Sequence, residues 1–483
     1  MSLTEKVIKP NDPLAFLTSP RTENKKRSIA ERRADFDEIY VKKAEAELNE
    51  QAARCLDCGN PYCEWKCPLH NYIPNWLELV KNNQLDAAAE LMHQTNPLPE
   101  ICGRVCPQDR LCEQACTLNT GFGAVNIGAI EKNVSDYALA KQWRPDLSDV
   151  ESTNKTVAIV GAGPAGLGCA ELLARNGVKP IVYDRYPEIG GLLTFGIPGF
   201  KLEKSVVKQR RKFLEDLGVE FHLNTEIGKD ISFEEIQSKS DAVFLGMGCY
   251  KSVTGKLQGS ESAGVIKALD YLIGNVNQQQ SFGMDDYAYF DLKDKTVVVL
   301  GGGDTAMDCV RSAVRQDAKQ VSCVYRRDKA SMPGSPNEVK NATEEGVNFM
   351  FNKQPLEILA DDNGQVKGVK CATTRLMQVE GESRSRFEVD ESENQILEAD
   401  VVILAFGFNA SPADWFEKNK INTDQWGLIE VSEKVTSSEV KSQATSMEGV
   451  FAGGDMVRGA DLVVTAIAEG RQAAREILEY LEV

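Results

Sequence analysis

The stretch TVAIVGAGPAGLGCAELLARNGVKPIVYDR, residues 156–185, decides the fold expected for this chain. It predicts a buried β-branched strand, a glycine turn, a helix and a second strand that ends in an acid, which is the order of a dinucleotide-binding unit. In its G-x-G-x-x-G pattern the first glycine makes the turn, the second lets the backbone approach a pyrophosphate, and the third lets the helix pack on the strand. The acid accepts hydrogen bonds from ribose hydroxyls and disfavours a 2′-phosphate, whereas an ordinary strand-to-helix turn would need no acid there. The predicted binding residues are Gly161, Gly163, Pro164, Ala165, Gly166 and Asp184.

A second unit of the same order follows in DKTVVVLGGGDTAMDCVRSAVRQDAKQVSCVYRR, residues 294–327. Its second strand ends in two arginines instead of an acid. Arginine pairs bidentately with phosphate, so this site should prefer NADP(H) to NAD(H). The alternative is a solvated arginine pair beside Asp328. The predicted binding residues are Gly301, Gly302, Gly303, Asp304, Thr305, Arg326 and Arg327.

An acid-type and an arginine-type site in one chain indicate FAD at the first unit and NADPH at the second. We expect the second unit to be inserted into the first, because DAVFLGMGCY (241–250) and ADVVILAFGF (399–408) are matching strand-to-glycine segments. Such segments are expected where a chain crosses between two dinucleotide domains. The C-terminal stretch GVFAGGDMVRGADLVVTAIAEGRQAAREILEYL would complete the FAD domain, with Gly454 and Asp455 at the ribityl chain and a helix that begins near Asp461. For Asp455 a surface loop is the alternative.

Eight of the 13 cysteines precede these units, in CLDCGNPYCEWKCP (55–68) and CGRVCPQDRLCEQAC (102–116). Zinc sites typically use two CxxC pairs or add histidines. Cysteine-only ligation with Cys-Pro endings resembles the way ferredoxin-type chains hold 4Fe-4S clusters, although four residues separate Cys58 from Cys63 where a bacterial ferredoxin has two. We therefore predict two 4Fe-4S clusters, with zinc and a structural cysteine cluster as alternatives. The five lone cysteines are expected to be small buried hydrophobes.

Helices are predicted around the cysteine motifs. One should begin at Ser28 and continue towards Cys55, and another should occupy residues 75–97 with an interruption at Asn82 and Asn83. These helices would form a small domain that the metal helps to hold together.

Composition narrows the function classes. The net charge of -17 argues against nucleic-acid binding, since phosphate contacts need a basic face. The sequence contains no run of about 18 apolar residues, so it predicts no membrane span. The start, MSLTEKVIKPNDP, lacks the apolar stretch of a signal peptide. We therefore expect a cytoplasmic α/β protein with two Rossmann-like domains, for FAD and NADPH, preceded by an α-helical iron-sulfur domain. The expected boundaries are 1–150 for the iron-sulfur domain, 151–285 and 405–483 for the two parts of the FAD domain, and 286–404 for the inserted NADPH domain.

In this order the segments resemble a known family. The eight-cysteine helical domain, GAGPAGL, GGLLTFGIPGFKL, GGGDTAMD, VYRRD and FAGGD are similar to the small (beta) subunit of bacterial NADPH-dependent glutamate synthase, from about Phe36 to the C-terminus. The same module is shared with the N-terminal half of dihydropyrimidine dehydrogenase and with the large subunit of NADH-dependent ferredoxin:NADP oxidoreductases. The resemblance therefore identifies the electron-input module more firmly than the destination of its electrons.

The resemblance implies a hydride from NADPH to FAD, then single electrons through the clusters to a large (alpha) subunit that carries FMN and makes glutamate from glutamine and 2-oxoglutarate. It adds Gly191 and Leu192 to the FAD site and places Lys201 near the flavin as a catalytic candidate; a surface lysine is the alternative. The same NADPH oxidation could instead serve ferredoxin or a pyrimidine reductase. A non-catalytic assembly or binding subunit is the remaining alternative.

For the clusters, the resemblance implies a ligand set. In the dihydropyrimidine dehydrogenase relative, one ligand is a glutamine beyond the second cysteine motif, and one cysteine of that motif is spare. VNIGAIEKN (125–133) puts Glu131 at the glutamine position, which departs from the relative because carboxylate is a harder ligand than amide. A plain surface carboxylate is the alternative. The expected ligands are Cys55, Cys58, Cys63, Cys67, Cys106, Cys112, Cys116, and Glu131 or Cys102.

Overall fold

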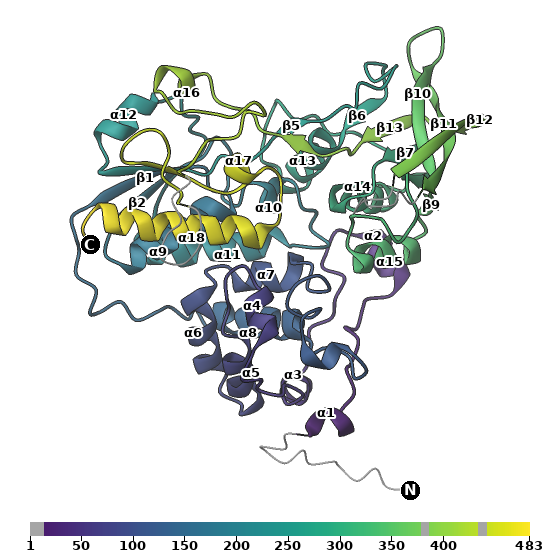
Figure 1. Cartoon of the computed structure of the whole chain (residues 1–483). Coiled ribbons are helices and arrows are strands. Elements are labelled where there is room, and N and C mark those ends of the chain that lie inside the picture. The colour runs from purple at the N-terminus through teal and green to yellow at the C-terminus, as the bar shows by residue number, and fades with distance from the viewer. Residues whose placement is uncertain (1–13, 378–385, 433–441) are drawn as a thin grey trace, which may run out of the picture.

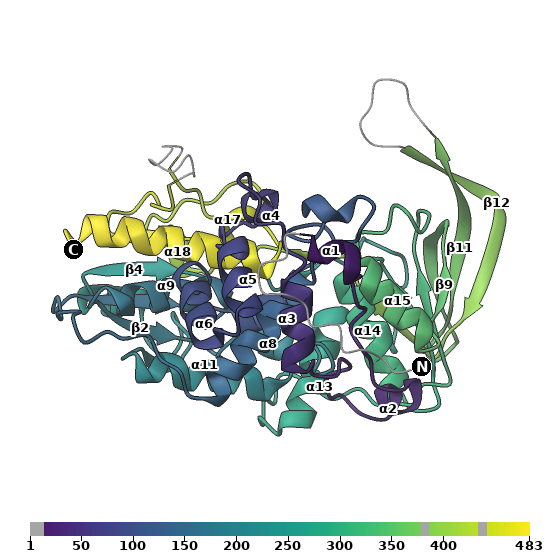
Figure 2. The same cartoon turned by 90° about the horizontal axis from the view of Figure 1, so that it is seen from below.

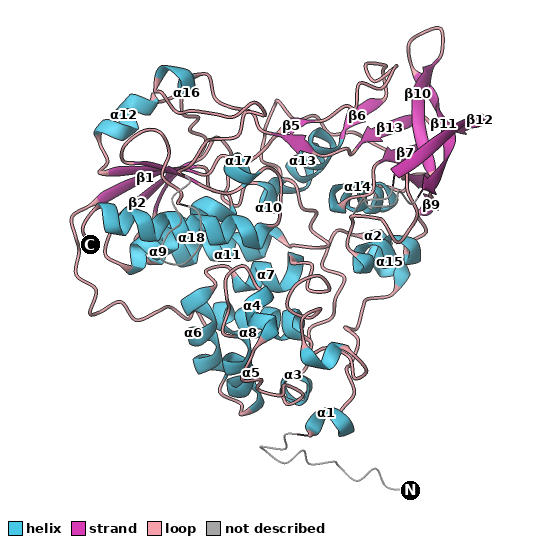
Figure 3. Cartoon of the chain, in the orientation of Figure 1, coloured by secondary structure: helices cyan, strands magenta, loops and turns pink. Residues whose placement is uncertain are grey.

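The computed structural model describes residues 14–377, 386–432 and 442–483. Figure 1 shows an all-helical N-terminal domain below two α/β bodies, and Figure 3 shows that the strands are confined to those bodies. The expected fold class, α/β with a helical N-terminal domain, is confirmed. Within the described ranges no helix has the length and apolar character needed to cross a membrane.

The helical domain contains an arm, residues 20–44, that differs from the sequence expectation. Ser28 caps α2 as predicted, because its side chain accepts from the Glu31 amide while the Glu31 carboxylate accepts from the Ser28 amide. A continuous helix from Ser28 towards Cys55 is wrong, since α2 ends at Ala34 and the next helix begins at Glu45. The residues between them are extended and pair with the start of the arm. The helices of this domain are α1 (Ala15–Thr18), α2 (Ile29–Ala34), α3 (Glu45–Ala52), α4 (Tyr62–Lys66), α5 (Ile73–Lys81), α6 (Leu85–Thr95), α7 (Pro99–Val105), the 3-10 helix η1 (Thr117–Asn119) and α8 (Ile127–Ala140).

The core of this domain is formed by α3, α5, α6 and α8. The predicted interruption at Asn82 and Asn83 is confirmed, because Asn83 adopts a left-handed φ of 64° between α5 and α6. Apolar side chains at helical spacing, such as Trp76 on α5 and Met92 on α6, are buried against α8. The cysteine loops are attached to this core.

The first α/β body contains a five-stranded parallel sheet in the order β15-β4-β1-β2-β3. Side chains alternate across β1, so Val157 and Ile159 face α9, α11 and α18, whereas Ala158 and Val160 face α12 and α16. The sheet is thus covered on both faces, as parallel sheets require. Its strands are β1 (Thr156–Val160), β2 (Lys179–Tyr183), β3 (Glu220–His222), β4 (Ala242–Leu245) and β15 (Val450–Ala452). Its helices are α9 (Pro164–Arg175), α10 (Leu192–Phe195), α11 (Lys204–Asp216), α12 (Phe233–Ser238), α16 (Trp415–Lys418), α17 (Asp455–Arg458) and α18 (Val463–Tyr480).

The second α/β body contains a parallel sheet in the order β6-β13-β7-β8-β9. Helices α13, α14 and α15 pack on one face, and a three-stranded antiparallel sheet packs on the other. The edge strand β6 precedes residue 286, so the sheet of this body starts earlier in the chain than the expected domain boundary. The strands are β6 (Val265–Lys267), β7 (Thr296–Leu300), β8 (Gln320–Val324), β9 (Asn348–Met350), β10 (Lys353–Ala360), β11 (Val366–Met377), β12 (Arg386–Glu398) and β13 (Val401–Leu404). The helices are α13 (Ala268–Gln280), α14 (Asp304–Arg315) and α15 (Pro336–Glu344).

The chain crosses between the two bodies twice, and the crossing segments lie side by side. Strand β5 (Lys251–Ser252) follows β4, β14 (Phe408–Asn409) follows β13, and the two pair antiparallel. Figure 2 shows the helical domain in front of both bodies, with α2 beside the second body. The helical domain therefore contacts both bodies.

Candidate functional site

The first glycine turn, between β1 and α9, leaves room for a phosphate group. A Cβ at Gly166 would lie 1.9 Å from the Gly161 carbonyl oxygen, so only glycine allows the helix to pack this closely. Gly161 has a φ of 106°, which also requires glycine. A Cβ at Gly163 would meet nothing within 4 Å. The backbone is therefore open towards solvent at the N-terminus of α9, which fits a dinucleotide diphosphate.

Asp184 ends β2 beside this turn. Its Oδ2 accepts a hydrogen bond from the Ala162 amide at 2.7 Å, and its Oδ1 accepts from the Tyr186 amide at 2.9 Å. Burial raises the pKa of the Asp184 carboxyl, although these two amide bonds favour the carboxylate. The acid is thus held at the end of the strand, where a ribose would lie.

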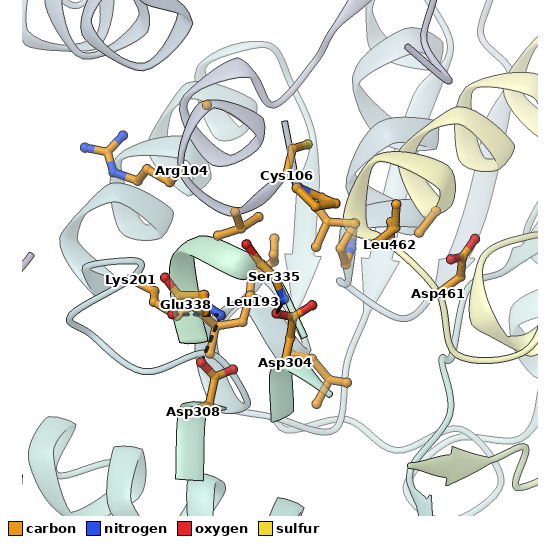
Figure 4. Close-up of a pocket in the computed structure, with 18 of the residues that line it drawn as sticks. Arg104, Cys106, Leu193, Lys201, Asp304, Asp308, Ser335, Glu338, Asp461 and Leu462 are labelled. Carbon is orange, nitrogen blue, oxygen red and sulfur yellow. Dashed lines mark hydrogen bonds and ion pairs between the residues drawn. The ribbon is translucent and has the colours of Figure 1, made fainter. Parts of the chain in front are cut away.

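One large cavity is shared by the three parts of the molecule. Its volume is about 490 Å³, within the usual range for ligand pockets. Figure 4 shows Lys201 and Leu462 of the first body, Asp304 and Ser335 of the second, and Cys106 of the helical domain around it. The predicted residues that line it are Gly161, Gly163, Pro164, Ala165, Asp184, Gly191, Leu192, Lys201, Asp304, Thr305, Gly454, Asp455 and Cys106.

Asp455 begins α17 and lines this cavity, so it does not lie on a surface loop. Burial raises the pKa of its carboxyl to about 6. The final helix, α18, begins at Val463, two residues beyond the expected Asp461, and its first turn lines the same cavity. Its amides therefore face the cavity from the side of the first body.

Lys201 lies between the two α/β bodies and is mostly covered, so it is not an exposed surface lysine. Its side chain is 13% exposed, and its Nζ lies 2.9 Å from Asp308 Oδ1 and 3.9 Å from Glu338 Oε2. Burial lowers the pKa of the Lys201 ammonium, but these carboxylates outweigh burial and raise it above its ordinary value. Sequence reasoning missed both acids. Asp308 stands one helical turn after Asp304, so its placement on the same face of α14 could have indicated it.

The second glycine turn, between β7 and α14, repeats the first. A Cβ at Gly301 would lie 2.2 Å from the Ala405 carbonyl oxygen, whereas a Cβ at Gly303 would meet nothing within 4 Å. The loop after β8 folds over this turn, because the Gly334 amide donates to the Gly302 carbonyl at 2.8 Å. This turn also leaves its backbone open to a diphosphate.

Arg326 and Arg327 follow β8 outside the shared cavity. Their guanidinium carbons lie 5.0 and 6.0 Å from the ring centre of Phe387 on β12. Arg326 is exposed, whereas Arg327 Nε is buried and has no hydrogen-bond partner within the described part of the chain. The guanidinium of Arg326 is therefore the one of the two that is open to a phosphate from solvent.

The cysteines form two sets that draw on both sequence motifs. Set I comprises Cys55, Cys58, Cys63 and Cys116, which line a cavity of about 20 Å³ between α4 and η1. Burial, and then the neighbouring thiols of Cys55 and Cys116, raise the pKa of Cys63 to about 12. The two cysteine loops thus pack together, and Cys116 of the second motif joins three cysteines of the first. This is the arrangement expected if the two motifs share their ligands.

Set II comprises Cys67, Cys106, Cys112, Cys102 and Glu131, since the thiols of Cys67, Cys106 and Cys112 each lie close enough to Glu131 to interact electrostatically. Burial raises the pKa of the Glu131 carboxyl to about 8. Its Oε1 accepts hydrogen bonds from Asn71 Nδ2 at 2.9 Å and from Asn96 Nδ2 at 3.0 Å. Since Glu131 is 7% exposed, the surface alternative is wrong. Its residue type and surroundings fit a ligand role.

Cys102 lies next to Cys106 in set II and is only 3% exposed. Its thiol donates to Asn96 Oδ1 at 3.7 Å. The five lone cysteines are buried, as predicted: Cys169, Cys249, Cys309, Cys323 and Cys371.

Among the described residues, no three acidic, histidine or cysteine side chains are grouped so that they could hold one metal ion.

The model of the family dihydropyrimidine dehydrogenase domain II, 4Fe-4S cluster, matches residues 32–143. This match supports an iron-sulfur domain over zinc and over a purely structural cysteine cluster. The model of the pyridine nucleotide-disulphide oxidoreductase family matches residues 155–470, which supports FAD and NAD(P) binding by the two α/β bodies. FprA from Mycobacterium tuberculosis has the same fold over 68% of this chain and 85% of its own, with a TM-score of 0.54 and 17% identity.

Two curated relatives match nearly the whole chain. The small chain of NADPH-dependent glutamate synthase from Halomonas elongata is 55% identical and covers 98% of this chain and 99% of its own length. The same subunit from Escherichia coli is 54% identical and covers 97% and 98%, respectively. The chain belongs to the family of small chains of NADPH-dependent glutamate synthase.

Proposed function

We propose that this chain is the NADPH-oxidising electron-input subunit of glutamate synthase. When bound, NADPH supplies a hydride to FAD, and 4Fe-4S clusters carry single electrons onward. The observation that carries the proposal is the shared cavity, which is lined by both α/β bodies and reaches Cys106 of set II. The two nucleotide sites and one cysteine set thus meet at one place.

The residues of the chain bind and orient in this proposal. The open backbone at Gly163 and Gly303 would hold the two diphosphates, and Asp184 would hold the FAD ribose. Arg326 and Arg327 would bind the 2′-phosphate of NADPH. Lys201 would fix the place where the two bodies meet, through its ion pair with Asp308. Positioning supplies the catalysis, because no set of acid-base side chains is needed.

We assign one 4Fe-4S cluster to each cysteine set. Set I supplies four thiols to the first cluster. For the second we favour Cys67, Cys106, Cys112 and Glu131. The hydrogen bonds from Asn71 and Asn96 both reach Oε1 of Glu131, which leaves Oε2 available as a ligand. Cys102 would be the spare cysteine, because its thiol donates to Asn96.

The acceptor would be the large (alpha) subunit, which carries FMN. Set I is the outer set, because Tyr62 lines its cavity and is itself 52% exposed. Trp65, on the same turn of α4, is 54% exposed and packs edge-to-face on Tyr62, with 5.4 Å between the ring centres. Exposed Trp and Tyr side chains are typical anchors of protein interfaces. Electrons would therefore leave towards a partner that covers this pair.

Trp65→Ala should uncouple the two subunits without harming NADPH oxidation. We expect glutamate formation with the large subunit to fall about tenfold, the loss typical of an interface anchor. Reduction of an artificial acceptor by NADPH should stay unchanged, as should iron per FAD. Trp426→Ala is the matched control, because Trp426 is 69% exposed on the first body. If both variants kept full glutamate formation, α4 would not be the docking site.

The proposed function is tested by purifying the untagged protein anaerobically from its own cells. It should elute with a large chain and form glutamate from glutamine, 2-oxoglutarate and NADPH, while its bound FAD bleaches with NADPH. Failure to bleach would exclude the electron-input role and favour an assembly subunit.

A second candidate is the same NADPH oxidation with another acceptor. The putative oxidoreductase AegA of Escherichia coli is 51% identical to this chain. The matching region covers 96% of this chain and 70% of AegA. The module therefore also occurs in proteins that are not named glutamate synthase. If the chain eluted alone yet its FAD bleached with NADPH, this second function would be favoured.

A further inference from the structure

Three parts of the chain meet at a buried cluster of charges beside the shared cavity. This cluster, which we call the junction, consists of Arg32, Phe200, Arg311, Arg315 and Glu345. Arg32 lies on α2 of the N-terminal arm, and Phe200 precedes Lys201 in the first body. The other three lie on α14 and at the end of α15 in the second body. The side chains of Arg32 and Glu345 are 2% and 0% exposed.

A single carboxylate, that of Glu345, accepts hydrogen bonds from all three arginines. Arg32 Nη2 donates to Glu345 Oε1 at 2.7 Å, and Arg311 Nη2 donates to the same oxygen at 2.9 Å. Arg315 Nη1 donates to Oε2 at 2.8 Å. The guanidinium carbons of Arg311 and Arg315 also lie 4.3 and 4.0 Å from the ring centre of Phe200. One carboxylate and one ring thus join the arm and both bodies.

The junction continues into the wall of the cavity. Arg311 Nη1 donates to Glu338 Oε2 at 2.6 Å, and Glu338 lies 3.9 Å from Lys201 Nζ. Phe200, Lys201 and Glu338 all line the cavity. A shift of the second body at the junction would therefore move the residues that surround the two nucleotide sites.

Stability alone does not account for Arg32. Buried ion pairs are often no more stabilising than apolar packing. Arg311 and Arg315 already supply four hydrogen bonds to the two oxygens of Glu345 from within the second body. What Arg32 adds is a link from that body to the arm. A second, less buried link runs beside it, because Lys26 Nζ lies 2.9 Å from Glu344 Oε2.

We propose that Arg32 is a positioning residue, which holds the second body at a fixed place relative to the FAD site of the first. The inference rests on the proposed hydride transfer from NADPH to FAD. A misplacement of about 1 Å can reduce the rate of a reaction about a hundredfold. Loosening the arm should therefore slow the reduction of FAD, while the second body still binds NADPH with its own residues.

The test compares Arg32→Met with Arg32→Lys and Arg33→Met. Arg33 follows Arg32 on α2 and is exposed, so it is the matched control. For Arg32→Met we expect the rate of FAD reduction at saturating NADPH, per bound FAD, to fall about tenfold. The dissociation constant of NADP⁺ should change less than about twofold. Arg32→Lys should restore most of the rate, and Arg33→Met should leave it unchanged.

Amide hydrogen exchange supplies a readout that does not depend on activity. In Arg32→Met, exchange should rise in α2, in α15 and around Phe200, whereas the strands of both parallel sheets should keep their protection. An unchanged rate per FAD, unchanged exchange at these three places, or an equal loss in Arg33→Met would overturn the proposal. If Arg32→Met failed to retain FAD, Lys26→Met would be measured in the same way, and an unchanged rate and exchange there would also overturn it. If NADPH did not bleach wild-type FAD, the proposed function would fail, and the exchange experiment would still test the junction.

Discussion

Arg326→Ala should weaken the binding of NADPH much more than the binding of NADH. A hydrogen-bonded contact to a charged group contributes about 1.5–3 kcal/mol, so we expect the KM for NADPH to rise between about tenfold and a hundredfold. Arg326 is exposed at the end of β8, away from the shared cavity, so the phosphate it would bind lies far from the reacting ring. Such a contact is equally strong before and during the reaction, so its removal raises KM and leaves kcat nearly unchanged. Initial rates with an artificial acceptor, measured for both nucleotides, check this result.

Lys329→Ala is the control for Arg326→Ala. Lys329 is an exposed cation three residues further along the same loop. Its replacement should change the KM for NADPH and the KM for NADH equally little. If Arg326→Ala reduced the affinity for both nucleotides to the same extent, the assignment of the 2′-phosphate to this arginine would be wrong.

Local patterns account for the parts of the fold that the sequence could predict. The glycine turns at Gly161 and Gly301 were identified because steric rules act on neighbouring residues, and the structure shows that a Cβ at Gly301 would clash with Ala405. Ser28 and Asn83 were identified for the same reason, since a helix cap and a left-handed residue depend on the adjacent backbone.

Long-range contacts explain what could not be predicted. Residues 28–55 have helical composition, yet the helix stops at Ala34, because Asp35 is extended and the residues after it pair with the chain before α2, through the bridge of Lys26 with Tyr40. Arg32 meanwhile pairs with Glu345, which lies on the second body far along the chain. The edge strand β6 has only three residues, too few for a periodic pattern. The division of the cysteines depends on the packing of two loops, so spacing alone could not show that Cys116 joins the set of the first motif.

Cys63→Ser should remove about half of the bound iron and leave FAD in place, because one of two 4Fe-4S clusters loses a ligand. Cys63 lines the small cavity of set I, whereas the residues of the FAD site lie in the shared cavity. NADPH should therefore still bleach FAD and reduce an artificial acceptor. Glutamate formation with the large subunit should fall to near zero, since set I is the outer set. Iron and acid-labile sulfide per FAD, together with both activities, check this prediction.

Cys102→Ser is the matched comparison, because Cys102 is also a cysteine of the helical domain but would be the spare one. It should keep its full iron content, since we assign the fourth ligand of set II to Glu131, whose hydrogen bonds from Asn71 and Asn96 both go to Oε1. Iron loss in Cys102→Ser would make Cys102 the ligand in place of Glu131. Full iron content in Cys63→Ser would contradict the assignment of set I itself. The two variants therefore separate the ligand question in set II from the existence of the cluster in set I.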